Sequence, residues 1–236
     1  MIRWTALVVL ILAGALGAWA SQGSGGGSAK LGKRYFEGFG CVRCHTIAGK
    51  GGAYGPDLTY VGFRKSKPWL DLWLGNPHGW KQDTVMPDLR LSELVRGSLV
   101  AYLSSLKGDA YRLSPPWDHA DLAAEPAKRG RVVFDKVGCA GCHGNAGAGG
   151  FPNNNVAGGK IPALKAVADG YSREELVAKI KQGVPQPAKE DPSGPAPMIH
   201  MPTWSEVLKD DEIEALADYL ISLKPKPTAA QAKDEW

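Results

Sequence analysis

The chain has 236 residues, of which 44% are apolar and 22% are charged. This length suits one large domain or two small ones, and the apolar share supports globular cores and excludes a wholly disordered chain. The formal net charge of +4 is mild, and the dense basic patch typical of nucleic-acid-binding proteins is absent, so we expect no nucleic-acid partner.

The chain begins with an uncharged apolar run at residues 4–20, directly after Arg3. The run ends in Ala18-Trp19-Ala20, which has the small-x-small form of a signal-peptidase site. It is longer than a usual signal core of about 7–15 residues and close to the lower limit of about 17 for a membrane-spanning helix. A retained anchor, which we favour, and a cleaved signal peptide at residues 1–20 both place the rest of the chain on the periplasmic side of the membrane. Residues 21–29 form a Gly/Ser-rich tether.

The rest of the chain contains two copies of one unit. CVRCH at 41–45 recurs as CAGCH at 139–143, and LVAYLSSLK at 99–107 recurs as LADYLISLK at 216–224. Such internal similarity indicates two small domains of the same kind. We therefore predict a first domain at 30–108, a linker at 109–123, a second domain at 124–226 and a C-terminal tail at 227–236.

Two insertions lengthen the second copy. They are GNAGAGGFPNNN at 144–155 and QGVPQPAKEDPSGPAP at 182–197. Both are rich in turn-forming residues, so we expect loops there.

Each unit is predicted to be mostly helical, which makes the fold class all-α with an additional N-terminal hydrophobic helix. A short helix should precede each cysteine pair, because apolar and small residues recur at i, i+3 and i+4. These residues are Gly32, Tyr35 and Phe36 in the first copy and Gly130, Val133 and Phe134 in the second. Middle helices are expected at 68–74 and 172–182, the second opened by a capping box of Ser172 and Glu175.

A last helix is expected in each unit, at 92–106 and at 210–223, with Ser92 and Asp210 as N-caps. Three short helices and long loops provide a thin core for a domain of this size. We therefore expect a further apolar group at the centre of each unit.

All four cysteines lie in the pattern C-x-x-C-H, which is the covalent haem attachment signature. Two thiols on one turn can bond two vinyl positions of one porphyrin, and the next histidine can then bind the iron. The predicted cofactors are two covalently bound haem c groups. The predicted attachment and proximal residues are Cys41, Cys44 and His45 in the first domain and Cys139, Cys142 and His143 in the second.

Other uses of the cysteines fit the sequence less well. A disulfide gives no reason for the adjacent histidine, and a thioredoxin-like site belongs in a βαβ pattern that is not visible. Zinc would need two further ligands at each site. Outside the motifs only His78, His119 and His200 remain, and we expect the first two to be surface or loop residues.

Methionine is the predicted second axial ligand, because its neutral thioether suits an iron that cycles between two oxidation states. Met86 and Met201 occupy equivalent positions of the repeat, and each precedes a proline. In the second domain the alternatives Met198 and His200 stay open, although the repeat favours Met201. Pro56 and Pro162 also match, as turn residues or as carriers of a carbonyl that accepts the other ring N–H of the ligating histidine.

The order G-x-x-x-F, CxxCH, P-x-L, M-P and a final helix with an aromatic residue resembles the class I c-type cytochromes. The resemblance covers residues 30–107 and 124–225, and implies that the first and last helices cross at Gly32 with Tyr102 and at Gly130 with Tyr219. Tandem domains on an N-terminal anchor are similar to periplasmic di-haem cytochromes and to di-haem subunits of cbb-type oxidases and bc-type quinol oxidoreductases. The resemblance thus implies redox partners among integral membrane respiratory subunits, or their photosynthetic counterparts.

The expected function is electron transfer rather than catalysis, because a six-coordinate haem iron has no open position for a substrate. Residues 29–109 carry 12 Lys/Arg and 7 Asp/Glu, whereas residues 110–236 carry 15 Lys/Arg and 17 Asp/Glu. Opposite net charges could steer the two domains towards different partners. Ordinary surface composition explains the counts equally well. The alternative function is a di-haem peroxidase-like enzyme, in which the second haem has an open position beside His200.

Overall fold

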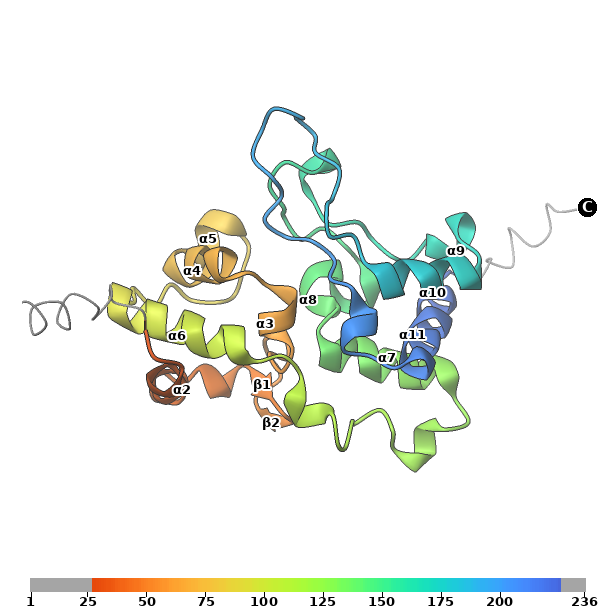
Figure 1. Cartoon of the computed structure of the whole chain (residues 1–236), viewed down its shortest axis with the longest axis horizontal. Helices are drawn as coiled ribbons and strands as arrows, with labels where there is room; N and C mark the ends of the chain where they lie inside the picture. The colour runs from red at the N-terminus through yellow and green to blue at the C-terminus, as the bar shows by residue number, and fades with distance from the viewer. Residues whose placement is uncertain (1–26, 226–236) are drawn as a thin grey trace, which may run out of the picture.

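The computed structural model describes residues 27–225 and places the two copies side by side as two helical halves (Figure 1). In the first half the long helices α2 and α6 cross, and three shorter helices lie between them in the sequence. The helices of the first half are α2 (Ala29–Gly38), α3 (Val61–Arg64), α4 (Lys67–Gly75), α5 (Pro77–Trp80) and α6 (Glu93–Ser105), with a 3-10 turn at Cys41–Arg43.

The second half repeats this arrangement with α7 crossing α11. Its helices are α7 (Pro126–Val137), α8 (Ala140–His143), α9 (Val167–Gly170), α10 (Arg173–Gln182) and α11 (Asp210–Ser222). Further 3-10 turns lie at Asp109–Tyr111, Ala120–Leu122, Asn145–Gly147, Ala157–Gly159 and Trp204–Glu206. The prediction of a mostly helical chain is thus confirmed. The predicted N-terminal helix falls outside the described residues.

One short hairpin departs from an all-α fold. Strand β1 (Thr46–Ile47) pairs antiparallel with β2 (Lys50–Gly51), directly after the first cysteine motif. The turn between them holds Ala48 and Gly49 at φ values of 52° and 75°. Positive φ at both central residues matches the twist of a two-residue hairpin, a local feature that helical periodicity does not reveal.

The crossing of the long helices depends on one glycine in each half. A Cβ placed on Gly32 would lie 1.9 Å from the carbonyl oxygen of Ser98, and one on Gly130 would lie 1.8 Å from that of Ala215. The aromatic residues predicted to pack beside these glycines do so, because Cβ atoms on the two glycines would lie 2.7 and 2.9 Å from the Cβ atoms of Tyr102 and Tyr219. Backbone contact without a side chain between the helices therefore sets how closely they approach.

The helix starts follow the sequence signals with two exceptions. Ser92 is the N-cap of α6, as predicted, but its side chain makes no capping hydrogen bond. Ser66 and Ser172 cap α4 and α10, and Ser172 forms the predicted capping box with Glu175. The prediction that Asp210 caps α11 is wrong by one residue. Lys209 is the N-cap, and its backbone N–H donates to the Glu212 carboxylate at 2.7 Å. The backbone N–H of the N-cap residue is therefore satisfied by the carboxylate of Glu212. We expected the side chain of Asp210 to accept a backbone N–H at this helix start.

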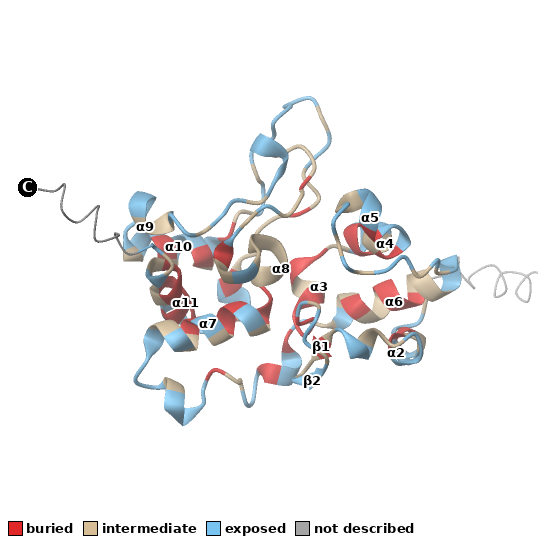
Figure 2. Cartoon of the chain, turned by 180° about the vertical axis from the view of Figure 1, so that it is seen from behind, coloured by how far each residue is buried: buried red, intermediate tan, exposed pale blue. Residues whose placement is uncertain are grey.

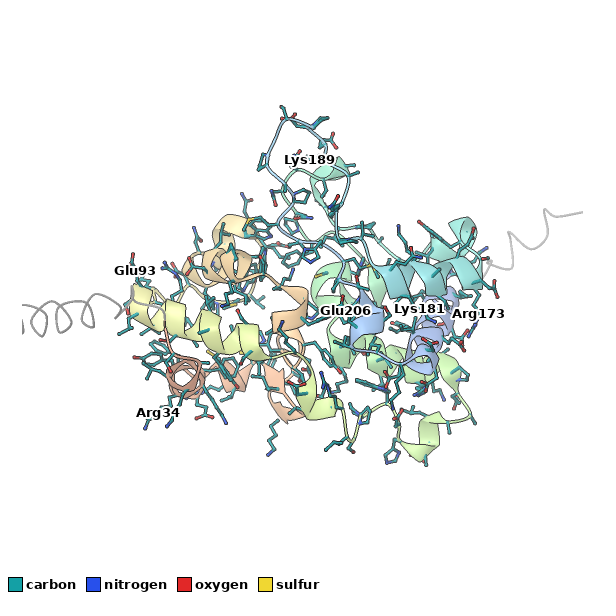
Figure 3. All side chains as sticks on the ribbon, viewed as in Figure 1. Arg34, Glu93, Arg173, Lys181, Lys189 and Glu206 are labelled. Atoms are coloured by element: carbon teal, nitrogen blue, oxygen red, sulfur yellow. The ribbon has the colours of Figure 1, made fainter. Side chains whose placement is uncertain are left out.

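The middle helix of the second half is tied to the last helix by charged pairs. Arg173 Nε lies 2.7 Å from Asp218 Oδ1, and Lys181 Nζ lies 2.9 Å from Asp210 Oδ1 (Figure 3). The apolar faces of α10 and α11 point inward between these pairs, so the buried residues lie along the inner side of each helix (Figure 2). The pairs fix α10 along α11 and so define one wall of the second half.

The predicted linker, residues 109–123, is packed rather than loose. Trp117 is 1% exposed, and its indole N–H donates to Glu212 at 2.7 Å. Tyr111 is also buried, and its hydroxyl donates to Asp57 in the first half at 3.1 Å. The segment therefore bonds to both halves. The prolines at 115 and 116 correctly indicated an interruption of helix, but the aromatic residues beside them bury the segment.

Across residues 27–225 no helix is both long and apolar enough to cross a membrane. The predicted anchor at residues 4–20 and the tail at 227–236 lie outside the described residues.

The close crossing makes the glycine of α2 a sensitive position. We expect G32A to lower the free energy of unfolding by about 1–3 kcal/mol or more, because the added methyl group overlaps the backbone of α6. Denaturant unfolding of the holoprotein measures this. G38A is the matched control, since a Cβ there meets nothing within 4 Å and Gly38 ends the same helix. Equal stability of the two variants would contradict the close crossing.

Candidate haem sites

Each cysteine motif forms a single turn directly after the first helix of its half. Gly40 and Gly138 adopt left-handed φ values of 73° and 88°, which end the preceding helix and redirect the chain. In the turn that follows, the backbone N–H of His45 donates to the Cys41 carbonyl at 3.0 Å, and that of His143 donates to the Cys139 carbonyl at 2.9 Å. The motif thus holds two thiols and an imidazole on one compact turn.

The histidine ring of each motif donates to a proline carbonyl. His45 Nδ1 lies 3.0 Å from the Pro56 oxygen, and His143 Nδ1 lies 3.1 Å from the Pro162 oxygen. A carbonyl only accepts, so Nδ1 carries the proton and the Nε2 lone pair is free for a metal. Burial lowers the pKa of both histidines, more than the carbonyl raises it, which favours the neutral ring that a metal requires.

The loop around Pro56 is shaped to receive the ring. A Cβ on Gly55 would lie 2.5 Å from His45 Cε1 and 2.7 Å from its Nδ1. A glycine before the proline therefore lets the backbone approach the imidazole. The next residue, Asp57, is buried and accepts from both Thr59 and Tyr111, which anchors the loop from behind.

The cysteines carry free thiols rather than disulfides in residues 27–225. Burial raises the pKa of the Cys139 thiol to about 12 and raises that of Cys41 above its ordinary value. A charged thiolate is thus disfavoured at both positions. An uncharged thioether suits the same apolar surroundings.

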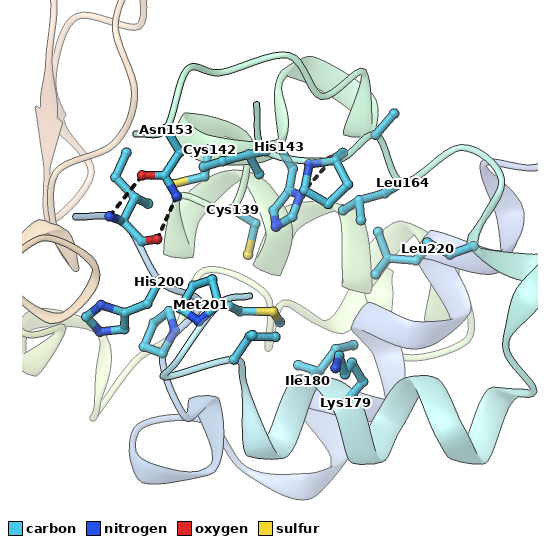
Figure 4. A pocket seen from close by; sticks show the side chains of 18 of the residues that line it. Cys139, Cys142, His143, Asn153, Leu164, Lys179, Ile180, His200, Met201 and Leu220 are labelled. Carbon is cyan, nitrogen blue, oxygen red and sulfur yellow. Dashed lines mark hydrogen bonds between the residues drawn. The ribbon is translucent and has the colours of Figure 1, made fainter. Parts of the chain in front are cut away.

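The second half contains a cavity of about 650 Å³ beside its cysteine motif. Cys139, Cys142 and His143 line one side, and Met201 lines the other, so that its sulfur and the imidazole point into the same space (Figure 4). His200 also lines this cavity, but its ring points in the opposite direction to the Met201 side chain in the same view. Met198 packs instead against the apolar cluster of the first half. The sequence left these three residues open, and the side-chain directions favour the predicted Met201.

The backbone of Met201 is held in place by α10. The backbone N–H of Val184, just beyond this helix, donates to the Met201 carbonyl at 2.8 Å. Gly183 precedes it with a φ of 65°, and a Cβ there would lie 2.2 Å from the Pro202 carbonyl oxygen. The glycine at the end of α10 therefore permits the approach that fixes the methionine loop.

In the first half the corresponding methionine has a polar neighbour. The indole N–H of Trp73, in α4, donates to Met86 Sδ at 3.0 Å. A sulfur that accepts a hydrogen bond on one lone pair keeps the other for a metal. Met86 also packs against the apolar cluster that contains Phe36 and Leu99, so it lies beside the crossing helices. Sequence reasoning missed Trp73, although its place in the helix before M-P was a usable signal.

Four buried donors of the first half, one of them the Ser104 hydroxyl, have no nitrogen or oxygen partner among the described residues, and three of the four are nitrogen atoms. The three nitrogen atoms are Arg64 Nε, Lys65 Nζ and Trp69 Nε1. Lys65 Nζ lies over the Trp69 ring, 4.1 Å from its centroid. Buried unpaired donors, two of them on cationic side chains, require a nearby acceptor. Haem carries two carboxylates, so these donors fit a haem group better than they fit an empty apolar core.

The family model of cytochrome c matches residues 29–107 and 127–224, and the chain belongs to this family. The two matched regions and the geometry of both motifs identify a di-haem class I c-type cytochrome. Cytochrome c domains imply covalently bound haem c.

Several curated proteins are similar to parts of the chain. The cytochrome c oxidase subunit 2 of Alkalihalophilus pseudofirmus is 36% identical over 34% of the chain and 26% of its own length. The cbb3-type cytochrome c oxidase subunit CcoP of Helicobacter pylori is 26% identical over 78% of the chain and 55% of its own length. Cytochrome c55X of Stutzerimonas stutzeri is 31% identical over 45% of the chain and 79% of its own length. The chain therefore spans about a quarter of the length of the first relative and about half of the length of the second.

The close contact between Gly55 and the His45 ring predicts how a substitution at Gly55 changes the redox potential of the first haem. In G55A the new methyl group should displace the His45 ring and weaken its bond to Pro56. A less basic imidazole stabilises ferric iron less, so we expect the potential of one haem to rise by about 20–60 mV, the equivalent of ~0.5–1.5 kcal/mol. Redox titration of the holoprotein measures the shift. Y54A is the control, because Tyr54 is 88% exposed in the same loop. An unchanged potential in G55A would contradict this role of Gly55.

Proposed function

We propose that the chain is a two-haem electron carrier that passes electrons between membrane redox partners of a respiratory or photosynthetic chain. One observation carries the proposal. In each half the imidazole has Nδ1 occupied and Nε2 free, directly after two thiols on the same turn. Haem c, when bound, supplies an iron that gains and loses one electron.

The proposed attachment residues are Cys41 and Cys44 in the domain at 30–108, and Cys139 and Cys142 in the domain at 124–226. The proposed axial ligands are His45 with Met86, and His143 with Met201. The repeat and the shared cavity of His143 and Met201 support the second pair. A histidine and a methionine on each iron leave no open position for substrate, which supports an electron carrier.

Contacts between the two halves support direct electron transfer between the sites. Pro56, whose carbonyl accepts from His45, lies against the second motif, since a Cβ on Gly141 would lie 3.6 Å from Pro56 Cβ. The Arg64 side chain also reaches the cavity of the second half. The first histidine thus adjoins the second attachment turn through one proline, a short packed path between the halves.

The relatives guide the proposed partners. Two of them are named as cytochrome c oxidase subunits, which supports a role within or attached to a membrane respiratory complex. Attachment through residues 4–20, on the periplasmic side, is part of the proposal. The excess of basic residues in 29–109 and of acidic residues in 110–236 would steer the two domains towards different partners.

The alternative of a peroxidase-like enzyme requires one haem with an open position near His200. The Met201 sulfur points into the space that His143 enters, and the His200 ring points in the opposite direction to the Met201 side chain, which favours the carrier (Figure 4).

The haem count tests the proposal. Mature holoprotein should carry the mass of two haem groups, C41A/C44A should carry one, and C139A/C142A should carry one. Mass spectrometry under denaturing conditions detects only covalent attachment. A wild-type protein with one haem or none would overturn the two-haem carrier.

The second axial ligand has its own test. M201A should show a high-spin ferric signal from one haem, because its iron loses the sulfur, whereas H200A should keep two low-spin signals. Electron paramagnetic resonance of the ferric proteins separates these outcomes. A high-spin signal in the wild type would instead support the enzyme, and loss of a low-spin signal in H200A alone would assign the ligand to His200.

A further inference from the structure

The two insertions of the second copy fold together into one unit. Three consecutive asparagines of the first insertion bond to the backbone of the second insertion and of the two residues that follow it. Asn153 donates to the Ile199 carbonyl at 2.8 Å, and the Ile199 N–H returns a bond at 3.2 Å. Asn154 accepts from the Met198 N–H at 2.7 Å. Residues 144–161 and 182–200, which we name the double loop, are therefore one bonded structure rather than two separate loops.

The far part of the double loop is held in the same way. Asn155 donates to the carbonyls of Asp191 and Pro195 at 2.9 and 2.7 Å, and its own side-chain oxygen accepts from the Asp191 N–H. Lys189 Nζ donates to the Gly194 carbonyl at 2.8 Å within the projecting part (Figure 3). Side-chain bonds to backbone groups thus replace the ladder of a sheet, which makes the projecting segment an ordered structure.

The base of the double loop packs against the first half. The Phe151 ring lies 6.4 Å from the Trp69 ring and 5.9 Å from the Trp73 ring, between centroids. The indole N–H of Trp80 donates to the Pro152 carbonyl at 3.0 Å. Ile199 is 3% exposed and belongs to the apolar cluster of the first half. A segment of the second copy therefore completes the core of the first.

These contacts reach the residue that holds the first methionine. Trp73 touches Phe151 on one side and donates to Met86 Sδ on the other. We propose that the double loop is a working part of the first haem site, and that Phe151 is a positioning residue that holds Trp73 against Met86. This inference rests on the proposed function, since it takes Met86 as an axial ligand.

The proposal explains why the insertions occur in the second copy. The aromatic cluster of Trp69, Trp73 and Trp80 is carried by α4 and α5 of the first half, and the double loop supplies the side chains that cover it. Coverage by Phe151 and Ile199 restricts the access of water and small ligands to the Met86 side of the first site. A loop of the second half therefore forms part of the first haem site.

The test uses the holoprotein with F151A and with the milder W80F, which loses the bond to Pro152 but keeps a ring. The probe is imidazole, an external ligand that competes with methionine for ferric iron. We expect its affinity for the first haem to rise by about 2–10-fold in F151A, the size of one lost aromatic contact. The Met86 methyl resonance of the reduced protein should shift, and it is assigned by its absence in M86H.

Three comparisons make the result specific. E190A changes an exposed side chain in the projecting part of the double loop and should leave both haems unchanged. The second haem should keep its imidazole affinity in F151A. In a W73F background the effect of F151A should shrink, because Phe151 acts through Trp73.

The outcomes separate this inference from the proposed function. A wild type without haem on Cys41 and Cys44 would overturn the proposed function. Wild type with Met86 bound to iron, together with unchanged imidazole affinity and Met86 resonance in both F151A and W80F, would overturn only the role of the double loop. An equal change at both haems would also overturn it, since that outcome indicates general loosening.

Discussion

The hydrogen bond from a histidine Nδ1 to a proline carbonyl is the interaction on which both halves depend. It fixes the tautomer and the direction of the ring, and it leaves Nε2 free for a metal. The crossing helices, packed together at Gly32 and Gly130, support the turn that carries each histidine. Each site is thus built from a short local motif and one carbonyl that arrives from further along the chain.

The two halves are joined by more than their linker. Arg64 of the first half reaches the cavity of the second, and Phe151 of the second half packs on the tryptophans of the first. Trp117 and Tyr111 of the intervening segment bond to acidic residues of opposite halves. A carrier with two redox centres benefits from such contacts, because they hold the separation of the centres constant while electrons move.

Buried charge gives a physical reason for a large cofactor beside the second cysteine motif, where Arg64 lines the cavity and Lys65 lies near Cys142. Lys65 Nζ and Arg64 Nε are buried without a nitrogen or oxygen partner in the part of the chain described. A cation so placed is costly unless an anion accompanies it. The carboxylates of a bound haem would accompany these cations, and its planar apolar ring would fill the thin helical core. A single haem group would therefore supply both the missing anion and the missing apolar core.

The sequence alone determined the repeat, the cysteine motifs, the order of the first, middle and last helix of each half, and the matched methionines and prolines, because these signals are local or depend on fixed spacing. It misplaced the cap of α11 and did not reveal the β1–β2 hairpin, since both depend on one or two backbone angles or side-chain bonds. Only the tertiary structure shows the side-chain directions that favour Met201 over Met198 and His200, since the three residues lie almost together along the chain. The contacts of Trp73, Phe151 and the Asn153–Asn155 run are also visible only there, because their partners lie more than ten residues away, where no periodic pattern extends.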